Sequence, residues 1–437
     1  MKKLVYLIIF FLYSTVMNAQ LKDLVQYVNT LQGTDSNFGL SYGNTYPTTG
    51  MPYGMHMWSA QTGKNGDGFK YMYAVDKIRA FSQSHQCSPW VSDYAVYSFM
   101  PMVGELVVNQ DARATKFSHD NEIAKPHYYK VTFDNGITTE MAPTTRGVHL
   151  RFSYPTTGDA YLVLDGYTDM SEIKIDPAKR QISGWVNNQR FVNDSKSFRN
   201  YFVVQFDKSF EDYGVWENQK DEVFPQKLDG SGKGYGAFIK FKKGSKVQAK
   251  AASSYISAEQ ALITLNKELG KDKNLEVTKA RGQKTWNEVL NRIVVEGCTD
   301  EQMKTFYSCL FRANLFSRKF YERKENGEPY YYSPYNGKIY DGYMYTDNGF
   351  WDTFRSQFPL TNILHPTMQG RYMNALLAAQ EQCGWLPSWS SPGETGGMLG
   401  NHSISLLADA WAKGIRDFDP EKALEAYAHE AMNKGPW

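Results

Sequence analysis

The sequence predicts a multidomain protein in which an antiparallel β-sandwich is followed by a helical domain. The chain has 437 residues, enough for two or three domains. Short extended segments separated by Gly, Asn, Asp and Pro dominate residues 20–256, and helical patterns with capping signals dominate the rest. Strands that all precede the helices indicate two successive domains rather than an alternating α/β fold.

The first residues have the pattern of a secretory signal peptide, which we place at 1–19. Lys2 and Lys3 precede an apolar run from Leu4 to Leu12, and Ala19 suits a cleavage site. We therefore expect export to the periplasm or the medium. Because no other long apolar run follows, we expect no membrane span.

The composition limits which classes of molecule we expect this protein to bind. The formal net charge is +2 and no basic block occurs, so nucleic acid is not an expected partner. Aromatic residues make up 15% of the chain, which suits stacking on sugar rings and also suits β-sandwich cores. None of the four cysteines has a C-x-x-C spacing, which disfavours a zinc cluster but leaves one or two disulfides open.

Residues 20–256 alternate apolar and polar positions in runs typical of strands. The segment HYYKVTFDNGITTEMAP, residues 127–143, contains two such runs around Asn135-Gly136, a dipeptide favoured in type I′ hairpin turns. Similar runs follow up to residue 256. This pattern predicts paired antiparallel sheets.

The helical part begins at residue 257, with linker helices at 257–297 and a helical domain at 298–437. Ser257 with Gln260, and Thr299 with Gln302, have the spacing of capping boxes. Asp419 followed by Pro420 predicts the start of a further helix.

One segment in this part, GFWDTFRSQFP at residues 349–359, combines an aromatic stripe with an acid and a base. Trp351, Phe354 and Phe358 share one face of the predicted short helix. Asp352 and Arg355 are spaced as an i, i+3 ion pair on a neighbouring face. The segment fits either a core helix with a surface ion pair or the wall of a sugar-binding cleft.

Three loops could contribute to such a cleft. Residues 32–55 are rich in Gly, Asn and Thr without a phosphate-binding glycine spacing, and fit an irregular loop as well. Residues 81–101 hold His85 and Cys87, which as a thiol–imidazole pair would be a less expected alternative to a packed loop. Residues 384–403 hold two Trp, including Trp389, with Glu394 and His402, a set that resembles a sugar subsite.

Glycoside hydrolysis needs two carboxyl groups, and the spacing of the nearest candidates pairs none of them. These candidates are Asp341, Asp347, Asp352 and Glu394. The sequence contains no HExxH motif, no EF-hand loop and no GxSxG motif.

Several segments together resemble glycoside hydrolase family 92, the exo-acting α-mannosidases. They are YGNTYPTTGMPYGM, KPHYYKVTFDNGITTEMAPTTRGVHLRFSYP, YTDNGFWDTFRSQFPLTNILHP, GWLPSW and MLGNHSISLLADAWAKGI. The resemblance implies an N-terminal β-sandwich followed by an (α/α)6 toroid, with the active site between them. It also implies calcium-dependent, inverting hydrolysis of terminal mannose, often α-1,2-linked, from glycans.

The resemblance carries over to individual residues. The family's Trp-Asp-x-x-Arg motif matches Trp351, Asp352 and Arg355. It implies that Asp352 holds mannose hydroxyls and that Arg355 orients it. His402 matches a helix start beside the same subsite, and Gly33 and Trp90 match sandwich segments that reach the cleft.

Two motifs of the family are missing from the sequence. The general acid belongs to a Glu-Gly-Asn-x-x-Gln-Tyr motif and the base to an Asp-Asp-x-Gly-Gln-Met-Ser motif, and neither string occurs. We expect both, with most calcium contacts, beyond Trp437, so we assign no catalytic residue and no metal ligand. The helices after residue 257 would then form only part of the toroid.

Three readings remain open. The first is an α-mannosidase whose chain is truncated and inactive. The second is a non-catalytic remnant that binds mannose-containing glycans. The third is another enzyme with a sandwich and a toroid, such as a disaccharide phosphorylase, although the sequence has no recognisable phosphate-binding loop or acid glutamate for that reaction.

Overall fold

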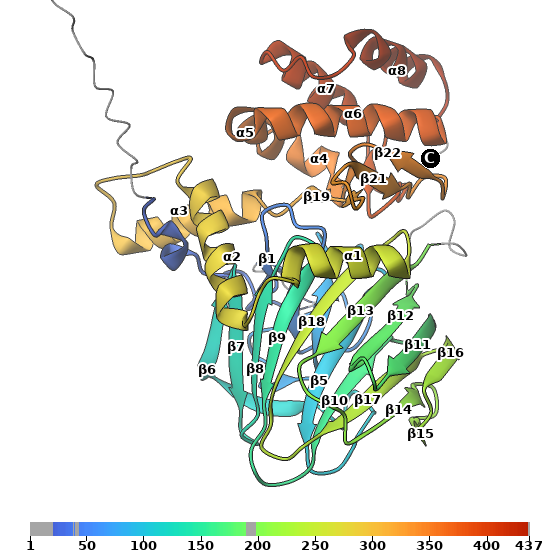
Figure 1. The fold of residues 1–437 in the computed structure, drawn as a ribbon. Helices are drawn as coiled ribbons and strands as arrows, with labels where there is room; N and C mark the ends of the chain where they lie inside the picture. The colour runs from blue at the N-terminus through green and yellow to red at the C-terminus, as the bar shows by residue number, and fades with distance from the viewer. Residues whose placement is uncertain (1–20, 38, 40–42, 189–197, 436–437) are drawn as a thin grey trace, which may run out of the picture.

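The computed structural model describes residues 21–37, 39, 43–188 and 198–435, which form a sandwich of sheets below a layer of helices (Figure 1). The expected signal peptide at 1–19 lies outside the described residues. A short 3-10 helix, η1 (Leu24–Tyr27), lies near the start of the described chain.

One sheet of the sandwich is antiparallel wherever its strands pair. Within the described residues its strands follow, in spatial order, as β1 (Thr49–Gly50), β2 (Met57–Gln61), β4 (Ala80–Ser84), β5 (Ser98–Val103), β10 (Ala160–Asp165), β17 (Tyr235–Phe241), β14 (Asp212–Glu217) and β15 (Glu222–Pro225).

The second sheet is antiparallel as well and lies against the first. Its described strands, in spatial order, are β16 (Asp229–Lys233), β11 (Met170–Asp176), β12 (Gln181–Val186), β13 (Asn200–Phe206), β18 (Lys246–Ser254), β9 (Gly147–Ser153), β8 (Thr138–Pro143), β7 (Tyr128–Phe133), β6 (Thr115–Lys125) and β3 (Lys77–Ile78).

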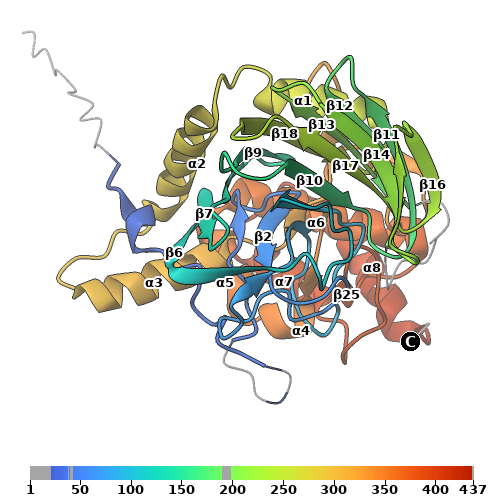
Figure 2. The ribbon, with the colours of Figure 1, turned by 90° about the horizontal axis from the view of Figure 1, so that it is seen from below.

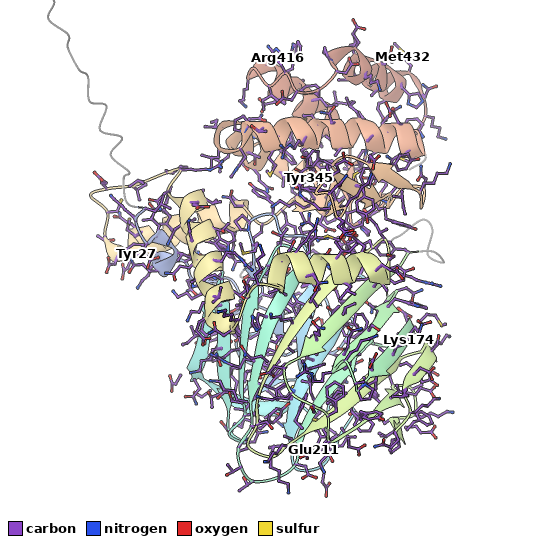
Figure 3. All side chains as sticks on the ribbon, viewed as in Figure 1. Tyr27, Lys174, Glu211, Tyr345, Arg416 and Met432 are labelled. Carbon is purple, nitrogen blue, oxygen red and sulfur yellow. The ribbon has the colours of Figure 1, made fainter. Side chains whose placement is uncertain are left out.

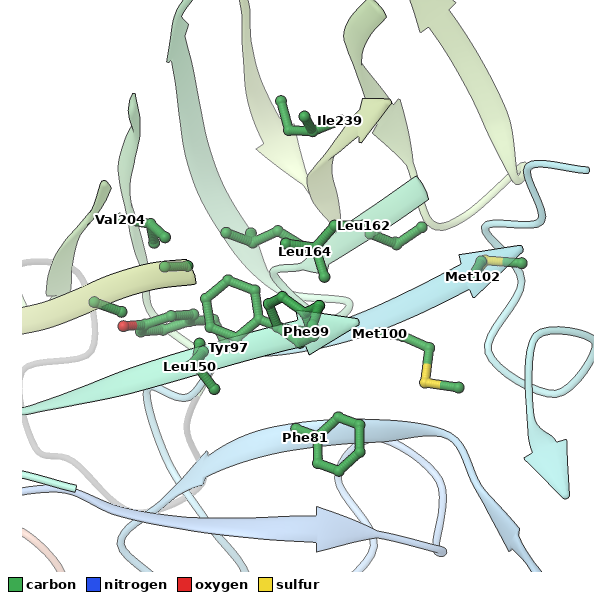
Figure 4. Packing of buried hydrophobic residues seen from close by; sticks show 14 of the residues in the cluster. Phe81, Tyr97, Phe99, Met100, Met102, Leu150, Leu162, Leu164, Val204 and Ile239 are labelled. Carbon is green, nitrogen blue, oxygen red and sulfur yellow. The ribbon is translucent and has the colours of Figure 1, made fainter. Parts of the chain in front are cut away.

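The main core lies between the two sheets (Figure 4). Phe99 and Leu162 of the first sheet and Leu150 and Val204 of the second are buried in one cluster. Alternate residues point to opposite faces of a strand, so the alternating runs in the sequence supply these inward side chains. Burying each such side chain contributes about 1.5–3 kcal/mol.

The hairpin around Asn135-Gly136 forms, but its turn differs from the expected type. Gly136 has a φ of +88° and is the only one of the two with a positive φ, whereas type I′ needs both. The Gly136 N–H bonds to the Phe133 carbonyl, and the Asn135 side chain accepts the Ile137 N–H. The connection is therefore a longer loop that needs only one left-handed residue.

Two helices cover the outer face of the second sheet, α1 (Ala258–Leu269) and α2 (Leu275–Leu290) (Figure 2). Ser257 caps α1 by accepting the Gln260 N–H, yet the Gln260 side chain bonds to Thr264 and to the Arg323 carbonyl. Only half of the predicted capping box therefore forms. The box of Thr299 and Gln302 is complete at the start of α3 (Asp300–Ala313).

Small strand pairs follow α3 and lie between the sandwich and the later helices. They are β19 (Arg318–Lys319) with β23 (Tyr345–Thr346), β20 (Glu322–Arg323) with β21 (Pro329–Tyr332) and β22 (Ile339–Asp341), and β24 (Asn348–Gly349) with β25 (Trp389–Ser390). Figure 3 shows Tyr345 at this junction.

The short helix predicted around residues 349–359 is two helices, α4 (Phe350–Thr353) and α5 (Gln357–Leu364). Pro359 has no N–H for the Arg355 carbonyl and its ring would clash there, so one continuous helix cannot pass through this segment. The aromatic stripe is divided accordingly. Phe358 is buried, whereas Trp351 is 38% exposed.

The remaining described helices form the layer above the junction. They are α6 (Pro366–Cys383), α7 (Ser403–Ala412) and α8 (Pro420–Met432). Asp419 caps α8 and Pro420 occupies its first turn, as predicted. The faces of α5 and α8 away from the core expose Ile363, Leu424 and Met432, and Figure 3 shows Met432 far from the sandwich. No helix of the described chain is both long enough and apolar enough to cross a bilayer.

Candidate carbohydrate-binding cleft

A cleft of about 740 Å³ lies where the sandwich meets the helical part. The sandwich contributes the segments 43–48 and 86–91, and the helical part contributes residues from 312–316, 347–357 and 389–398. The cleft is thus built from both domains.

Trp389 forms part of one wall, held by a tight contact with Gly349. The two residues are direct partners in the β24–β25 ladder. A Cβ atom on Gly349 would lie 2.1 Å from Nε1 of the Trp389 indole. Glycine is therefore required at 349 for the indole to occupy this position.

Glu394 organises the loop that carries Trp389. Its buried carboxylate accepts the backbone N–H groups of Ser388 at 2.7 Å and Gly396 at 2.8 Å, and the Ser388 hydroxyl at 2.9 Å. Burial raises the pKa of Glu394 above its usual range. This carboxyl group, one of the candidates from the sequence, does not line the cleft and holds the loop together.

A buried ion pair of the helical part forms hydrogen bonds to the sandwich beneath the cleft. The Arg318 guanidinium bonds to the Asp347 carboxylate, with Nε at 2.5 Å, and also to the Tyr94 hydroxyl and the Met55 carbonyl. Arg318 and Asp347 have no exposed side-chain surface. Burial raises the pKa of Asp347 to about 6, although Arg318 and the Tyr94 hydroxyl, 2.9 Å from Oδ2, favour the ionised form.

Asp352 is the exposed carboxylate of the cleft wall. Among the described residues it forms no ion pair within 4 Å, so the expected pair with Arg355 is absent. The Arg355 guanidinium instead lies over the rings of Phe354 at 4.5 Å and Trp351 at 5.7 Å. The turn between α4 and α5 separates Arg355 from the last helical residue of α4, which removes the i, i+3 geometry.

Of the six residues that the sequence assigned to substrate binding, Trp90, Asp352 and Trp389 line the same cleft. Trp90 is 67% exposed and meets Phe69 edge to face at 5.9 Å. Gly33 lies behind the wall, where its carbonyl accepts the N–H of the lining residue Thr45 at 3.0 Å. Arg355, Gly33 and His402 are not lining residues.

His402 precedes α7 and stacks on Phe354, with ring centroids 4.3 Å apart and an angle of 8°. Arg355 also contacts Phe354. The structure therefore brings His402 and Arg355 to the same ring, behind the segment that carries Asp352.

The His85–Cys87 alternative does not have the geometry of a thiol catalyst. His85 Nδ1 lies 2.8 Å from the Tyr94 carbonyl, and Nε2 lies 2.8 Å from His56 and 3.1 Å from the Tyr255 hydroxyl. Both ring nitrogens are thus occupied by partners other than Cys87. Burial raises the pKa of the Cys87 thiol well above its usual range, which disfavours the nucleophilic thiolate. All four cysteines are free.

Several lining residues were missed by the sequence reasoning. Asn348 accepts the Thr353 hydroxyl at 2.9 Å and donates to Ser317 at 3.0 Å, fixing the start of α4. Arg312 donates to the Gln32 carbonyl at 2.6 Å and to the Thr45 hydroxyl at 3.2 Å. Gly349, one position after Asn348, is the N-cap residue of α4, and nothing in the sequence marks Asn348 or Arg312 as lining residues.

A calcium ion needs several oxygen ligands close together in one place. Among the described residues no three His, Cys, Asp or Glu side chains lie close enough together to hold a metal ion. Asp341, the remaining carboxylate candidate, is exposed and pairs with Lys324. The described carboxylates alone therefore do not fit the calcium site that the resemblance implies.

The fold and the cleft place the chain among glycoside hydrolases that join a β-sandwich to a helical domain. The model of the glycosyl hydrolase family 92 N-terminal domain matches residues 27–254, and that of the family 92 catalytic domain matches residues 260–437. The chain belongs to glycosyl hydrolase family 92.

Solved structures agree with this assignment. The chain is 44% identical to a family 92 inverting mannosidase from Bacteroides thetaiotaomicron VPI-5482, with a TM-score of 0.92 over 94% of this chain and 56% of that one. An α-mannosidase of the family from B. thetaiotaomicron shares the fold at 24% identity, with a TM-score of 0.81 over 95% of this chain and 58% of that one. The predicted fold class, a β-sandwich followed by part of an (α/α)6 toroid, is confirmed.

A fungal relative is more distant. An uncharacterised secreted glycosidase of Arthroderma benhamiae is 22% identical, over 95% of this chain and 53% of its own length. The chain therefore spans a little over half the length of these relatives.

Proposed function

We propose that this chain forms the sugar-binding part of an exported α-mannosidase, and that its ligand is a terminal, α-1,2-linked mannose of a glycan. The observation that supports this proposal is the cleft at the domain junction, which is lined by the exposed Trp90, the largely buried Trp389 and the exposed carboxylate of Asp352. Aromatic faces suit sugar rings, and a carboxylate accepts hydroxyl protons. The mannosidase relative at 44% identity supports the choice of sugar.

In this proposal Asp352 accepts hydrogen bonds from the sugar, and Trp90 and Trp389 contact its faces. Gly33 supports the wall through Thr45. Arg355 and His402 set the position of Phe354 and so of the segment that carries Asp352. The secreted fungal relative supports export to the periplasm or the medium.

The proposed reaction of the full-length protein is inverting hydrolysis assisted by calcium. Inverting enzymes place an acid and a base carboxyl group roughly 6.5–9.5 Å apart around the scissile bond. Among the described residues the carboxylates that line the cleft are those of Asp347 and Asp352, and Asp347 is committed to Arg318. We therefore assign neither as acid or base, and we assign no calcium ligand among the described residues.

Binding is tested by titrating methyl α-mannoside into the chain and measuring heat. We expect saturable binding that Asp352→Asn weakens at least tenfold, because a neutral amide is a poorer acceptor. Asp341→Asn is the matched control, since Asp341 is an exposed carboxylate outside the cleft. Absent binding, or equal loss in both variants, would contradict the proposed sugar site.

Catalysis is tested separately with α-1,2-mannobiose, first with calcium and then with EDTA. We expect no mannose release from the 437-residue chain. Release that depends on calcium would overturn the expectation that acid and base lie elsewhere. A chain that binds mannose without hydrolysing the disaccharide would also fit the alternative function, a non-catalytic glycan-binding protein.

A further inference from the structure

A second cavity, of about 250 Å³, opens on the outer face of the sandwich and shares no lining residue with the cleft. Its ionisable lining residues are Lys179, Arg180, Lys250, Lys273, Asp207 and His149. They come from the β11–β12 turn, the end of β13, β18, β9 and the segment before α2.

The pairing of neighbouring strands places the residues at the bottom of this cavity side by side. Lys250 on β18 is the direct partner of Gln205 on β13 and of His149 on β9. Direct cross-strand partners share a face of the sheet. The alternate residues Ala249 and Leu150 lie in the core between the sheets, so the row that includes Lys250 faces outward.

The cavity carries an excess of positive charge. Its walls hold four cationic side chains against the single lining carboxylate of Asp207, and of the four Lys179 pairs with Asp176 at 3.2 Å. Lys250 forms no ion pair within 4 Å among the described residues, and burial lowers its pKa. The nearby carboxylate of Asp272 is engaged by the Thr278 hydroxyl at 2.7 Å and by Arg281 at 2.8 Å.

His149, a lining residue of the same cavity, carries a buried hydrogen-bond acceptor without a donor among the described residues. Its Nδ1 lies 3.0 Å from the Thr278 hydroxyl oxygen, and that hydroxyl donates its proton to Asp272. The Thr278 oxygen can therefore only accept, so Nδ1 carries the hydrogen. Burial lowers the pKa of His149 to about 4, which leaves Nε2 unprotonated at neutral pH.

This Nε2 atom is buried and has no hydrogen-bond partner among the described residues. A buried acceptor without a donor costs about 1–3 kcal/mol, so a ligand that supplies a hydroxyl donor would be stabilised here. An oxyanion would in turn satisfy Lys250 and Arg180.

We propose that this cavity binds a phosphate group accompanied by a hydroxyl donor, which is the P–OH of hydrogen phosphate or a ring hydroxyl of a sugar phosphate. Oxygens of the phosphate accept from Lys250 and Arg180, and the hydroxyl donates to His149 Nε2. Sulfate has the same shape and charge as hydrogen phosphate but no hydroxyl. The site therefore distinguishes phosphate from sulfate, and it acts independently of the sugar cleft.

The binding experiment is calorimetric titration of the chain near neutral pH at constant ionic strength. Its three ligands are inorganic phosphate, glucose 6-phosphate and sulfate. We expect saturable binding of phosphate at least tenfold tighter than of sulfate. Tighter binding of glucose 6-phosphate than of phosphate would identify a sugar phosphate as the ligand, and weaker binding would identify the free ion. Failure of both phosphates to bind, or equal binding of sulfate, overturns the proposal.

Variants separate the cavity from general surface charge. Lys250→Met is expected to weaken phosphate binding at least tenfold. Lys246→Met, on the same strand and the same face but outside the cavity, should stay within twofold of the parent. Lys273→Gln, at an exposed lining position, provides a second test if Lys250→Met fails to fold. Equal affinity in parent, Lys250→Met and Lys273→Gln overturns the assignment.

His149→Asn tests the acceptor directly. The Asn amide can still donate toward Thr278, whereas the atom equivalent to Nε2 is lost. We expect the preference for phosphate over sulfate to fall to within twofold while the melting temperature confirms folding. An unchanged preference in a folded variant would show that His149 does not contact the ligand.

Discussion

Glu322 shows how one buried carboxyl group makes stability depend on pH. Its Oε1 accepts the Tyr255 N–H at 2.8 Å, and burial raises its pKa from 4.5 to about 7. Between these values the folded state binds more protons than the unfolded state, so the free energy of unfolding falls as pH rises.

We predict that this group lowers the free energy of unfolding by about 1.4 kcal/mol per pH unit across that window, or about 3 kcal/mol in total. Glu322→Gln does not titrate, so its stability relative to the parent should increase by that amount as pH rises. Urea denaturation at several pH values measures this difference. Glu325→Gln, at an exposed glutamate, is the control and should show no such trend.

Gly349 is the residue on which the position of Trp389 depends. We predict that Gly349→Ala displaces the indole, lowers the free energy of unfolding by about 1–3 kcal/mol and weakens mannoside binding at least tenfold. Adding Trp389→Phe should restore part of the stability, because the smaller ring relieves the clash, but not the binding. Unchanged affinity in Gly349→Ala would show that the indole is not part of the sugar site.

At the scale of elements, the loop at residues 388–397 depends on a single carboxylate. Glu394→Ala leaves the N–H groups of Ser388 and Gly396 without their acceptor. We predict a loss of about 2–4 kcal/mol in the free energy of unfolding, together with weaker mannoside binding. Glu394→Gln retains one acceptor oxygen and should lose less. Hydrogen exchange at Gly396 that stays slow in Glu394→Ala would contradict this role.

Elements were predictable from the sequence where the signal was local. The alternation of residues 127–143 and the capping box at Thr299 depend on neighbours within a few positions, and both appear in the structure. The break between α4 and α5 could also be predicted, because Pro359 forbids a continuous helix. The spacing of the aromatic residues nevertheless led to the prediction of one short helix. The prediction of a type I′ turn at Asn135-Gly136 was wrong, because that dipeptide is compatible with several loops.

The sites were less predictable, because they depend on register between distant strands. Asp352, Trp389 and Trp90 were found through motifs and composition and do line one cleft. By contrast, His149 and Lys250 are 101 residues apart, and only their pairing across β9 and β18 makes them neighbours. The basic residues of this cavity are dispersed along the chain, so they do not appear in the sequence as a basic block.

At the scale of the whole molecule, exposed apolar side chains on the helical layer are the feature that most favours self-association. Ile363, Leu424 and Met432 are 71%, 66% and 83% exposed. Exposed apolar side chains of this kind favour association. We predict concentration-dependent self-association of this chain, which Leu424→Glu with Met432→Lys should reduce in light scattering. Leu228→Glu, at an exposed site on the sandwich, should have little effect.

The Arg318 ion pair has a consequence for how a sugar enters the cleft. Arg318 and Asp347 both belong to the helical part, whereas Tyr94 and Met55 belong to the sandwich. Spreading the two walls would therefore break the buried, charge-assisted hydrogen bonds that Arg318 and Asp347 form with the sandwich. Hinge opening is therefore strongly disfavoured, and a glycan end meets a preorganised cleft. Association should then follow a single exponential whose rate rises linearly with ligand concentration, without a plateau set by a gating motion.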